Sequence, residues 1–254
     1  MKNAVSLRPT YWASVSGGKD SLYMLKLIFE RPETYPLDGV VHFELETDFP
    51  FIKNVIDYME SECKKHGVPF LRIKPRVPWG ELYDKYSYPS RVARWCNSKY
   101  KLDCSRQLEN LAVQSGKYVV HYIGFCADEI RRFKNTQTQI YPIADFGIDE
   151  HIILQWAKTQ PIFNDYYIYN RRCGCMLCPC SAYINFAYLY KYYPAEYERL
   201  MDLCKKSERE RGYTALSGKY SAEYIDRVVK TKYAQKIDEI RKAYEIEKLM
   251  GVFE

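Results

Sequence analysis

The hexapeptide Ser16–Ser21, with the sequence S-G-G-K-D-S, constrains this chain more than any other segment. A short apolar run, Tyr11–Val15, precedes it, and apolar residues at helical spacing follow it at Leu22, Leu25 and Ile28. Two glycines between a strand and a helix let backbone N–H groups approach an anion closely, and the helix dipole adds positive potential there. The segment therefore predicts a strand, a glycine turn and a helix that cradle a phosphate group.

The polar side chains of the hexapeptide favour this interpretation over a plain tight turn. Lys19 supplies a full positive charge, and the hydroxyls of Ser16 and Ser21 can hydrogen-bond phosphate oxygens. Asp20 can hold Mg²⁺ that is bound to the phosphates, since this ion prefers carboxylate and phosphate oxygens; complementing the helix dipole is its simpler role. The spacing differs from G-x-x-x-x-G-K-[ST], so the segment is not a Walker loop.

Apolar periodicity predicts further strands and helices in alternation. The predicted elements are a helix over Phe51–Lys64, a strand over Phe70–Ile73, a helix over Arg106–Gln114 and a strand over Tyr118–Ile123. Strands separated by helices imply a parallel sheet with right-handed crossovers, in which ligands bind beyond the carboxyl ends of the strands. Ser16, Thr47 and Asp128 all follow strand ends, so we expect them to meet in one crevice.

The pattern changes at about Phe163, where a cysteine-rich turn is followed by helices, including an amphipathic one over Ala222–Met250. We therefore predict a nucleotide-binding α/β domain over residues 1–162 and a cysteine-metal loop with a helical C-terminal region over residues 163–254. The proline-rich stretch from Pro69 to Pro89 is the predicted long loop.

Five segments in this order resemble the N-type ATP pyrophosphatases and their relatives, the phosphoadenosine phosphosulfate (PAPS) reductase family, in its phage- and mobile-element-type members. S-G-G-K-D-S resembles the pyrophosphate loop (PP-loop) of that superfamily. The other four are Val40–Pro50, Arg94–Leu102, Ile123–Arg132 and Gly174–Pro179. The likeness spans roughly residues 11 to 200 and implies a doubly wound parallel sheet of the Rossmann-like, adenine nucleotide alpha hydrolase type.

The resemblance also implies an adenine nucleotide, either ATP or one of the sulfonucleotides adenylyl sulfate (APS) and PAPS, together with Mg²⁺. It assigns catalytic roles to Lys19, Asp20 and Lys101. The nucleotide-binding residues that it implies are Ser16, Gly17, Gly18, Lys19, Asp20, Ser21, Thr47, Arg94, Asp128, Arg131 and Arg132. A solvated charged face is the alternative for the arginines and for Lys101, and Asp128 can orient either ribose or magnesium.

The cysteines are the second strong signal, because four of the nine lie within Cys173–Cys180. Close cysteine spacing in a cytosolic setting points to metal or redox chemistry rather than disulfides. The C-x-x-C pair of Cys175 and Cys178, followed by proline, is typical of iron–sulfur loops. One pair cannot complete a site, and the resemblance to cluster-containing adenylyl-sulfate reductases supplies Cys96. Those enzymes use adjacent cysteines there, whereas Asn97 follows Cys96 in this chain.

The fourth ligand and the metal both remain open at this point. We take Cys104 as the fourth ligand, with Cys173, Cys180 or an open iron as alternatives. A [4Fe-4S] cluster is favoured over Zn²⁺, which four thiolates also suit, and over no metal at all. The remaining three cysteines, Cys63, Cys126 and Cys204, are predicted to be small buried hydrophobes.

The net charge and the hydropathy of the chain limit which kinds of partner we expect. Lysine and arginine number 38 against 32 acidic residues, and this net charge of +6 suits an anionic ligand and permits nucleic acid without demanding it. No run approaches eighteen apolar residues and no secretory segment is evident, so we expect a cytoplasmic protein without a membrane partner. Among the 25 tyrosines, those beside lysine or arginine can stack on bases, although packing at helix surfaces is favoured. Nothing indicates an oligomeric state.

Three functions compete. The first is ATP-dependent adenylyl or sulfur transfer with release of pyrophosphate, with a sulfur donor and a nucleic-acid acceptor as candidate partners. The second is an APS or PAPS reductase with a thioredoxin-like reductant, but that group uses a cysteine near the C-terminus and this chain has none after Cys204. The third is a non-catalytic nucleotide-sensing or DNA-associated module, which a degraded loop would favour. We expect the first, because the loop is intact.

Overall fold

The computed structural model describes residues 7–250 except 135, 213–215 and 217–218. The chain divides into two compact units, neither of which is continuous in sequence. The first unit comprises residues 1–45, 49–76 and 99–163, and the second comprises residues 46–48, 77–98 and 164–254. The second unit thus contains the cysteine-rich region together with two segments from the first half of the chain.

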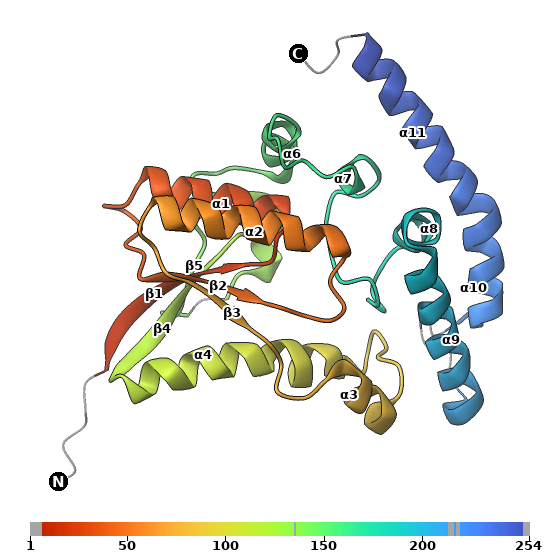
Figure 1. The fold of residues 1–254 in the computed structure, drawn as a ribbon, viewed down its shortest axis with the longest axis horizontal. Coiled ribbons are helices and arrows are strands. Elements are labelled where there is room, and N and C mark those ends of the chain that lie inside the picture. Colours follow the sequence, from red (N-terminus) through yellow and green to blue (C-terminus); the bar gives the residue numbers. More distant parts are fainter. Residues whose placement is uncertain (1–6, 135, 213–215, 217–218, 251–254) are drawn as a thin grey trace. The chain divides into compact units, whose positions relative to one another are not determined.

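The first unit is built on a five-stranded sheet in which every strand pairing is parallel (Figure 1). Its strands, in the order β3-β2-β1-β4-β5, are β1 (Arg8–Val15), β2 (Gly39–Phe43), β3 (Phe70–Ile73), β4 (Lys117–Ile123) and β5 (Gln139–Ile140). Ser14 on the central strand pairs with Val41 on one side and Ile123 on the other. The predicted parallel α/β sheet is confirmed.

Helices cover both faces of this sheet. Helices α1 (Lys19–Glu30) and α2 (Pro50–Lys65) lie on one face and α4 (Leu102–Gln114) on the other, as Figure 1 shows. The short helix α5 (Pro142–Asp145) and α6 (Glu150–Lys158) pack against α1. The core between these layers is aliphatic; Met24, Ile28, Val40, Val41 and Ile56 are among its buried side chains.

The strand order creates a topological switch point between β1 and β4. From β1 the chain moves to β2 and β3 on one side of the sheet, and then returns to β4 on the other side. Ligands of open α/β sheets bind outside the carboxyl ends of the strands at such a point. Ser16 follows the end of β1 and Gly124 follows the end of β4, so both lie there.

The second unit is helical, and the predicted helical C-terminal region is confirmed. Its helices are α3 (Trp79–Tyr86), α7 (Tyr166–Tyr169), α8 (Tyr183–Tyr192), α9 (Pro194–Arg211), α10 (Ala222–Val228) and α11 (Ala234–Leu249). A π-helical turn, η3 (Val229–Tyr233), joins α10 to α11 within the region that the sequence predicts as one helix, and a second, η1 (Cys96–Lys101), precedes α4. The core of this unit is rich in aromatic residues, with Tyr88, Tyr166, Phe186 and Tyr197 at most 1% exposed.

The prediction of a long loop from Pro69 to Pro89 is wrong, because this stretch contains β3 and α3. Trp79, Leu82 and Tyr83 of α3 are all buried, and their spacing places them on one face of a helix. Pro78 is compatible with this helix, since it is the residue that caps the N-terminus and proline lacks only a donor that has no helical partner there. Across the described residues, none of the helices combines the length and the apolar character needed to cross a lipid bilayer.

Candidate functional site

The loop between β1 and α1 has a backbone that favours glycine. Gly17 has φ +73°, and a Cβ atom there would lie 2.8 Å from Cγ2 of Ile52 on α2. The buried Ser21 hydroxyl donates to the carbonyl oxygen of Gly18 at 2.9 Å and accepts from the N–H of Ser16 at 3.3 Å. Ser21 therefore fastens the loop to the first turn of α1, while Ser16 is exposed.

A second glycine lets the end of β4 approach the same helical turn. A Cβ atom on Gly124 would lie 3.0 Å from the backbone oxygen of Asp20 and 3.2 Å from the backbone nitrogen of Ser21. Backbone atoms of a helix cannot give way as the tip of a side chain can. Gly124 is thus explained by the close contact between the carboxyl end of β4 and the N-terminus of α1.

Lys19 is buried at this N-terminus and pairs with two carboxylates. Its Nζ atom donates to Oδ1 of Asp20 at 2.6 Å and to Oε1 of Glu150 at 3.2 Å, and its side chain is 1% exposed. Glu150 is the first residue of α6, whose N-cap Asp149 accepts a hydrogen bond from the N–H of Ile152. A buried ammonium group needs such partners, because an unpaired charge in the interior is costly.

Negative charge concentrates around Asp20. Burial raises the pKa of Asp20, Lys19 opposes this rise, and the neighbouring carboxylates of Glu150 and Glu129 add to it. The Sγ atom of Cys126 donates to Oδ1 of Asp20 at 3.7 Å. Burial also raises the pKa of the Cys126 thiol, which stays protonated at neutral pH and packs as the small buried residue that the sequence predicts.

Some residues of the acidic and basic motif that follows β4, Asp128–Arg132, make contacts within the first unit. Nη1 of Arg132 donates to Oε1 of Glu129 at 2.5 Å, and the guanidinium carbon lies 4.0 Å from the ring centroid of Phe125. Asp128 and Arg131 are exposed. Glu129 is buried and contributes to the raised pKa of Asp20, and Cys126 contacts Asp20, so the motif begins beside the glycine loop. That Asp128, Arg131 and Arg132 bind a nucleotide there stays a prediction.

The other predicted nucleotide residues are distributed between the two units. Lys101 is half-buried in the first unit, at the end of η1. Thr47 and Arg94 belong to the second unit, where the backbone oxygen of Thr47 accepts from the N–H of Met176 at 2.8 Å and Arg94 is exposed. That these three side chains join the glycine loop in one crevice stays a prediction.

Three of the predicted metal ligands affect the pKa of a buried tyrosine of the second unit. The hydroxyl of Tyr88 donates to the carbonyl oxygen of Leu177 at 2.8 Å. The pKa of Tyr88 is raised by burial and then by the thiols around it, which are Cys204, Cys175, Cys178 and Cys96. These four thiols come from three separate segments of the chain, and all of them raise the pKa of Tyr88.

The positions of the thiol side chains in the structure do not form a metal-binding group. Thiolates are the right donors for iron–sulfur clusters and zinc. Yet across residues 7–250, apart from the six positions that are not described, no three His, Cys, Asp or Glu side chains are gathered closely enough to hold a metal ion. Cys104 is fully buried on α4 of the first unit, so its role as fourth ligand stays a prediction. Cys63 and Cys204 are fully buried, as predicted.

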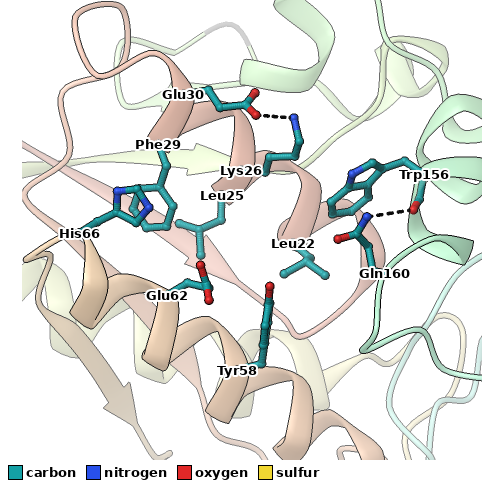
Figure 2. Close-up of a pocket in the computed structure, with 10 residues that line it drawn as sticks. All are labelled: Leu22, Leu25, Lys26, Phe29, Glu30, Tyr58, Glu62, His66, Trp156 and Gln160. Carbon is teal, nitrogen blue, oxygen red and sulfur yellow. Dashed lines mark hydrogen bonds and ion pairs between the residues drawn. The ribbon is translucent and has the colours of Figure 1, made fainter.

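A separate cavity of about 400 Å³ lies along α1, α2 and α6 (Figure 2). Leu22 and Leu25 face it from α1, Tyr58 from α2 and Trp156 from α6, and His66 stacks on Phe29 at its edge with ring centroids 4.0 Å apart. None of the residues of the glycine loop lines this cavity. The candidate site is therefore the loop at the switch point and not this hollow.

Fold and site together define an α/β domain with a glycine loop at the switch point of a parallel sheet. No family model matches the chain. The chain is 27% identical over 205 residues to an uncharacterized protein of Methanocaldococcus jannaschii, in an alignment that covers 76% of this chain and 47% of that protein. It thus spans about half the length of this curated relative.

Among solved structures, the chain is similar to the U34-tRNA thiolase NcsA from Methanococcus maripaludis with its [4Fe-4S] cluster. The identity is 15%, the TM-score is 0.43, and the alignment covers 91% of this chain and 75% of that one. These are similarities at low identity, and neither assigns a family, a ligand or a reaction to this chain.

Proposed function

We propose that this chain is a PP-loop enzyme that binds ATP at Ser16–Ser21 and activates an acceptor by adenylation, with release of pyrophosphate. The observation that carries the proposal is the glycine loop itself. It lies at the switch point, Gly17 adopts positive φ, and the N–H groups that begin α1 come next. Backbone N–H groups at a helix N-terminus favour bound phosphate.

Lys19 and Asp20 would exchange partners when a triphosphate enters. Phosphate oxygens would replace the carboxylates at the Lys19 ammonium, because they are equally good charge-assisted acceptors. Asp20, no longer neutralised by Lys19, would then hold Mg²⁺ that arrives with the phosphates and offsets their charge. Attack of the acceptor on the α-phosphorus would leave pyrophosphate in contact with the loop N–H groups and Lys19, which stabilise the charge that develops on it.

We further propose that the thiols around Tyr88 serve sulfur transfer, with a nucleic-acid base or backbone as acceptor. Thiolates are both nucleophiles and metal ligands, and Cys96, Cys175 and Cys178 all contribute to the raised pKa of the Tyr88 hydroxyl. Their chemistry suits a [4Fe-4S] cluster, with zinc as the alternative, although their present spacing gathers no metal group.

Calorimetric titration with Mg·ATP tests the nucleotide site. Lys19→Ala should weaken binding by about 1.5–3 kcal/mol, because it removes a charge-assisted contact while the loop backbone remains. Lys26→Ala is the matched control, since Lys26 is a lysine of the same helix whose Nζ pairs with Glu30. Equal affinities of all three proteins for ATP would contradict the role of Lys19.

The reaction itself separates this proposal from sulfonucleotide reduction. With its true acceptor, the protein should convert ATP to AMP and pyrophosphate. An APS or PAPS reductase would instead release sulfite in the presence of a thioredoxin-like reductant. Sulfite release at catalytic turnover would overturn the proposal in favour of that activity.

A further inference from the structure

The tyrosines of the second unit include both buried and exposed side chains. Tyr88, Tyr166 and Tyr197 are at most 1% exposed, whereas Tyr220 and Tyr224 are each 38% exposed. The rings of Tyr220 and Tyr224 are stacked, with centroids 4.6 Å apart and planes 21° from parallel. Packing into a core accounts for the first group, whereas the second pair presents part of its ring surface to solvent.

Local structure fixes this pair in place. Tyr220 precedes Ser221, which caps α10, and Tyr224 lies in the first turn of that helix. The hydroxyl of Ser221 accepts a hydrogen bond from the N–H of Tyr224 at 3.2 Å. The two rings are thus held by a capped helix start, and a ligand that stacks on them would meet a preformed surface.

Two more rings extend this surface. Tyr183, at the start of α8, meets Tyr233 edge to face with centroids 5.5 Å apart and planes at 85°. Burial and then the nearby hydroxyls of Tyr220, Tyr224 and Tyr233 raise the pKa of Tyr183, so the four side chains are neighbours. We call Tyr183, Tyr220, Tyr224 and Tyr233 the tyrosine platform.

Cations flank the platform. Nζ of Lys219 lies 5.3 Å from the ring centroid of Tyr220, and Cζ of Arg227 lies 5.4 Å from that of Tyr224. Arg91 is close enough to Tyr183 to oppose the rise in its pKa. From Lys219 to Lys236 the sequence has five lysine or arginine residues against two acidic ones.

The exposed tyrosine rings and the cations beside them together indicate a class of ligand. Exposed aromatic faces alone would suit a cationic ligand as well as a planar one, but the flanking lysine and arginines repel a cation. A ligand that is planar and also carries negative charge meets both features. Single-stranded nucleic acid is such a ligand, because its unpaired bases stack on aromatic rings while its phosphates contact lysine and arginine.

We propose that the tyrosine platform binds an unpaired segment of a nucleic acid, with bases stacked on Tyr220 and Tyr224 and phosphates beside Lys219 and Arg227. That this nucleic acid is the acceptor of the reaction depends on the function proposed above. Its binding to the platform does not depend on that function, because no residue of the glycine loop belongs to the platform. A phosphate-only contact would hold a duplex as well as a single strand, whereas stacking requires unpaired bases.

Fluorescence anisotropy with a labelled oligouridylate of about 12 nucleotides tests the platform, with a duplex RNA of equal length as the second probe. The wild-type chain should bind the single strand more tightly than the duplex. Tyr224→Leu should weaken single-strand binding by about 5- to 100-fold, since stacking on one ring contributes that much. Tyr224→Phe keeps the ring and should keep the affinity. Arg227→Ala should reduce the salt dependence of binding.

Matched controls separate the platform from general surface effects. Tyr192→Leu removes another exposed tyrosine of the second unit, and Arg199→Ala removes another exposed arginine. Both should bind the single strand as the wild-type chain does. Circular dichroism checks that each variant keeps its helices.

Three results would overturn the proposal: no binding of the single strand by the wild-type chain, equal binding by Tyr224→Leu, or equal affinity for strand and duplex. Each is read without ATP. Failure of the nucleotide site would appear instead as loss of Mg·ATP binding with oligouridylate binding unchanged, so the two failures are distinguishable.

Discussion

The ammonium group of Lys19 donates to a carboxylate that lies 131 positions away in the sequence, with 3.2 Å between Nζ and Oε1 of Glu150. Asp20 is the second acceptor, and Lys19 thus joins the start of α1 to the start of α6. The same ammonium is the side chain that we propose for the phosphates of ATP. On that proposal, Glu150 would compete with the nucleotide for Lys19.

This competition predicts the effect of Glu150→Gln. Glutamine keeps an oxygen that accepts from Lys19 but removes one negative charge from the site. Mg·ATP should bind roughly tenfold more tightly, or by about 1.4 kcal/mol, because repulsion between Glu150 and the phosphates is lost. Calorimetric titration measures the change. Glu33→Gln, at an exposed position after α1, is the control and should leave the affinity unchanged. Weaker binding by Glu150→Gln would instead make Glu150 a residue that positions Lys19 for the ligand.

The glycine loop and the sheet could be predicted from sequence because their signals are local. Two glycines between an apolar run and a helical period specify the turn, and the strand predicted over Phe70–Ile73 has the bounds that the structure shows. Glu150 could not be predicted, since nothing within α6 indicates a partner so far away. Asp149 signals only that a helix begins there. Pairing across sequence distance depends on how the chain packs, and a single sequence carries no pattern for it.

The cysteines also show that contacts between distant parts of the sequence are hard to predict from the sequence alone. The resemblance groups Cys96 with Cys175 and Cys178, and this grouping stays a prediction; all three thiols contribute to the raised pKa of Tyr88, to which no sequence motif points. In the proline-rich stretch after β3, the prolines indicate a loop. The buried face of Trp79 and Leu82 determines a helix instead, because apolar burial outweighs the proline signal outside the helix interior.

Gly17→Ala should destabilise the first unit more than a comparable substitution elsewhere. Alanine would face the strain of φ +73° and a Cβ contact of 2.8 Å with Ile52. We expect a loss of about 2–4 kcal/mol in the free energy of unfolding, from left-handed strain and overpacking together. Gly147 has φ +66°, and a Cβ atom there would meet nothing within 4 Å, so Gly147→Ala isolates the strain and should cost about 1–2 kcal/mol. Urea unfolding measures both. Equal losses would show that Ile52 does not constrain the loop.

Two histidines beside the loop, the buried His42 and the largely buried His121, predict how stability depends on pH. Nδ1 of His42 lies 3.0 Å from the carbonyl oxygen of Val15, and Nδ1 of His121 lies 3.0 Å from Oγ of Ser14. Burial lowers the pKa of both rings from the ordinary 6.5. The unfolded chain then binds more protons than the folded one, so the stability from these rings is present above pH 6.5 and is lost as the pH falls below it.

Urea unfolding at about pH 7.5 and about pH 5.5 measures this loss. The double variant His42→Asn with His121→Asn should show a smaller difference between the two pH values than the wild-type chain does. His151→Asn alters an exposed histidine and should keep the wild-type difference. If the double variant also keeps the wild-type difference in stability between the two pH values, groups other than these two histidines cause the loss of stability in acid.

The metal prediction rests on the thiols around Tyr88. Protein made and purified without oxygen should be brown and contain about four irons and four sulfides per chain. Cys175→Ser should abolish the visible absorption, because it removes one sulfur of the C-x-x-C pair and a cluster loses its iron when a ligand is lost. Cys63→Ala is the matched control, since Cys63 is fully buried on α2 of the first unit and should leave the iron content unchanged. Full metal content in Cys175→Ser would show that Cys175 is not a ligand. Zinc in iron-replete, anaerobic protein, lost in Cys175→Ser, would keep the ligand set and make the metal structural.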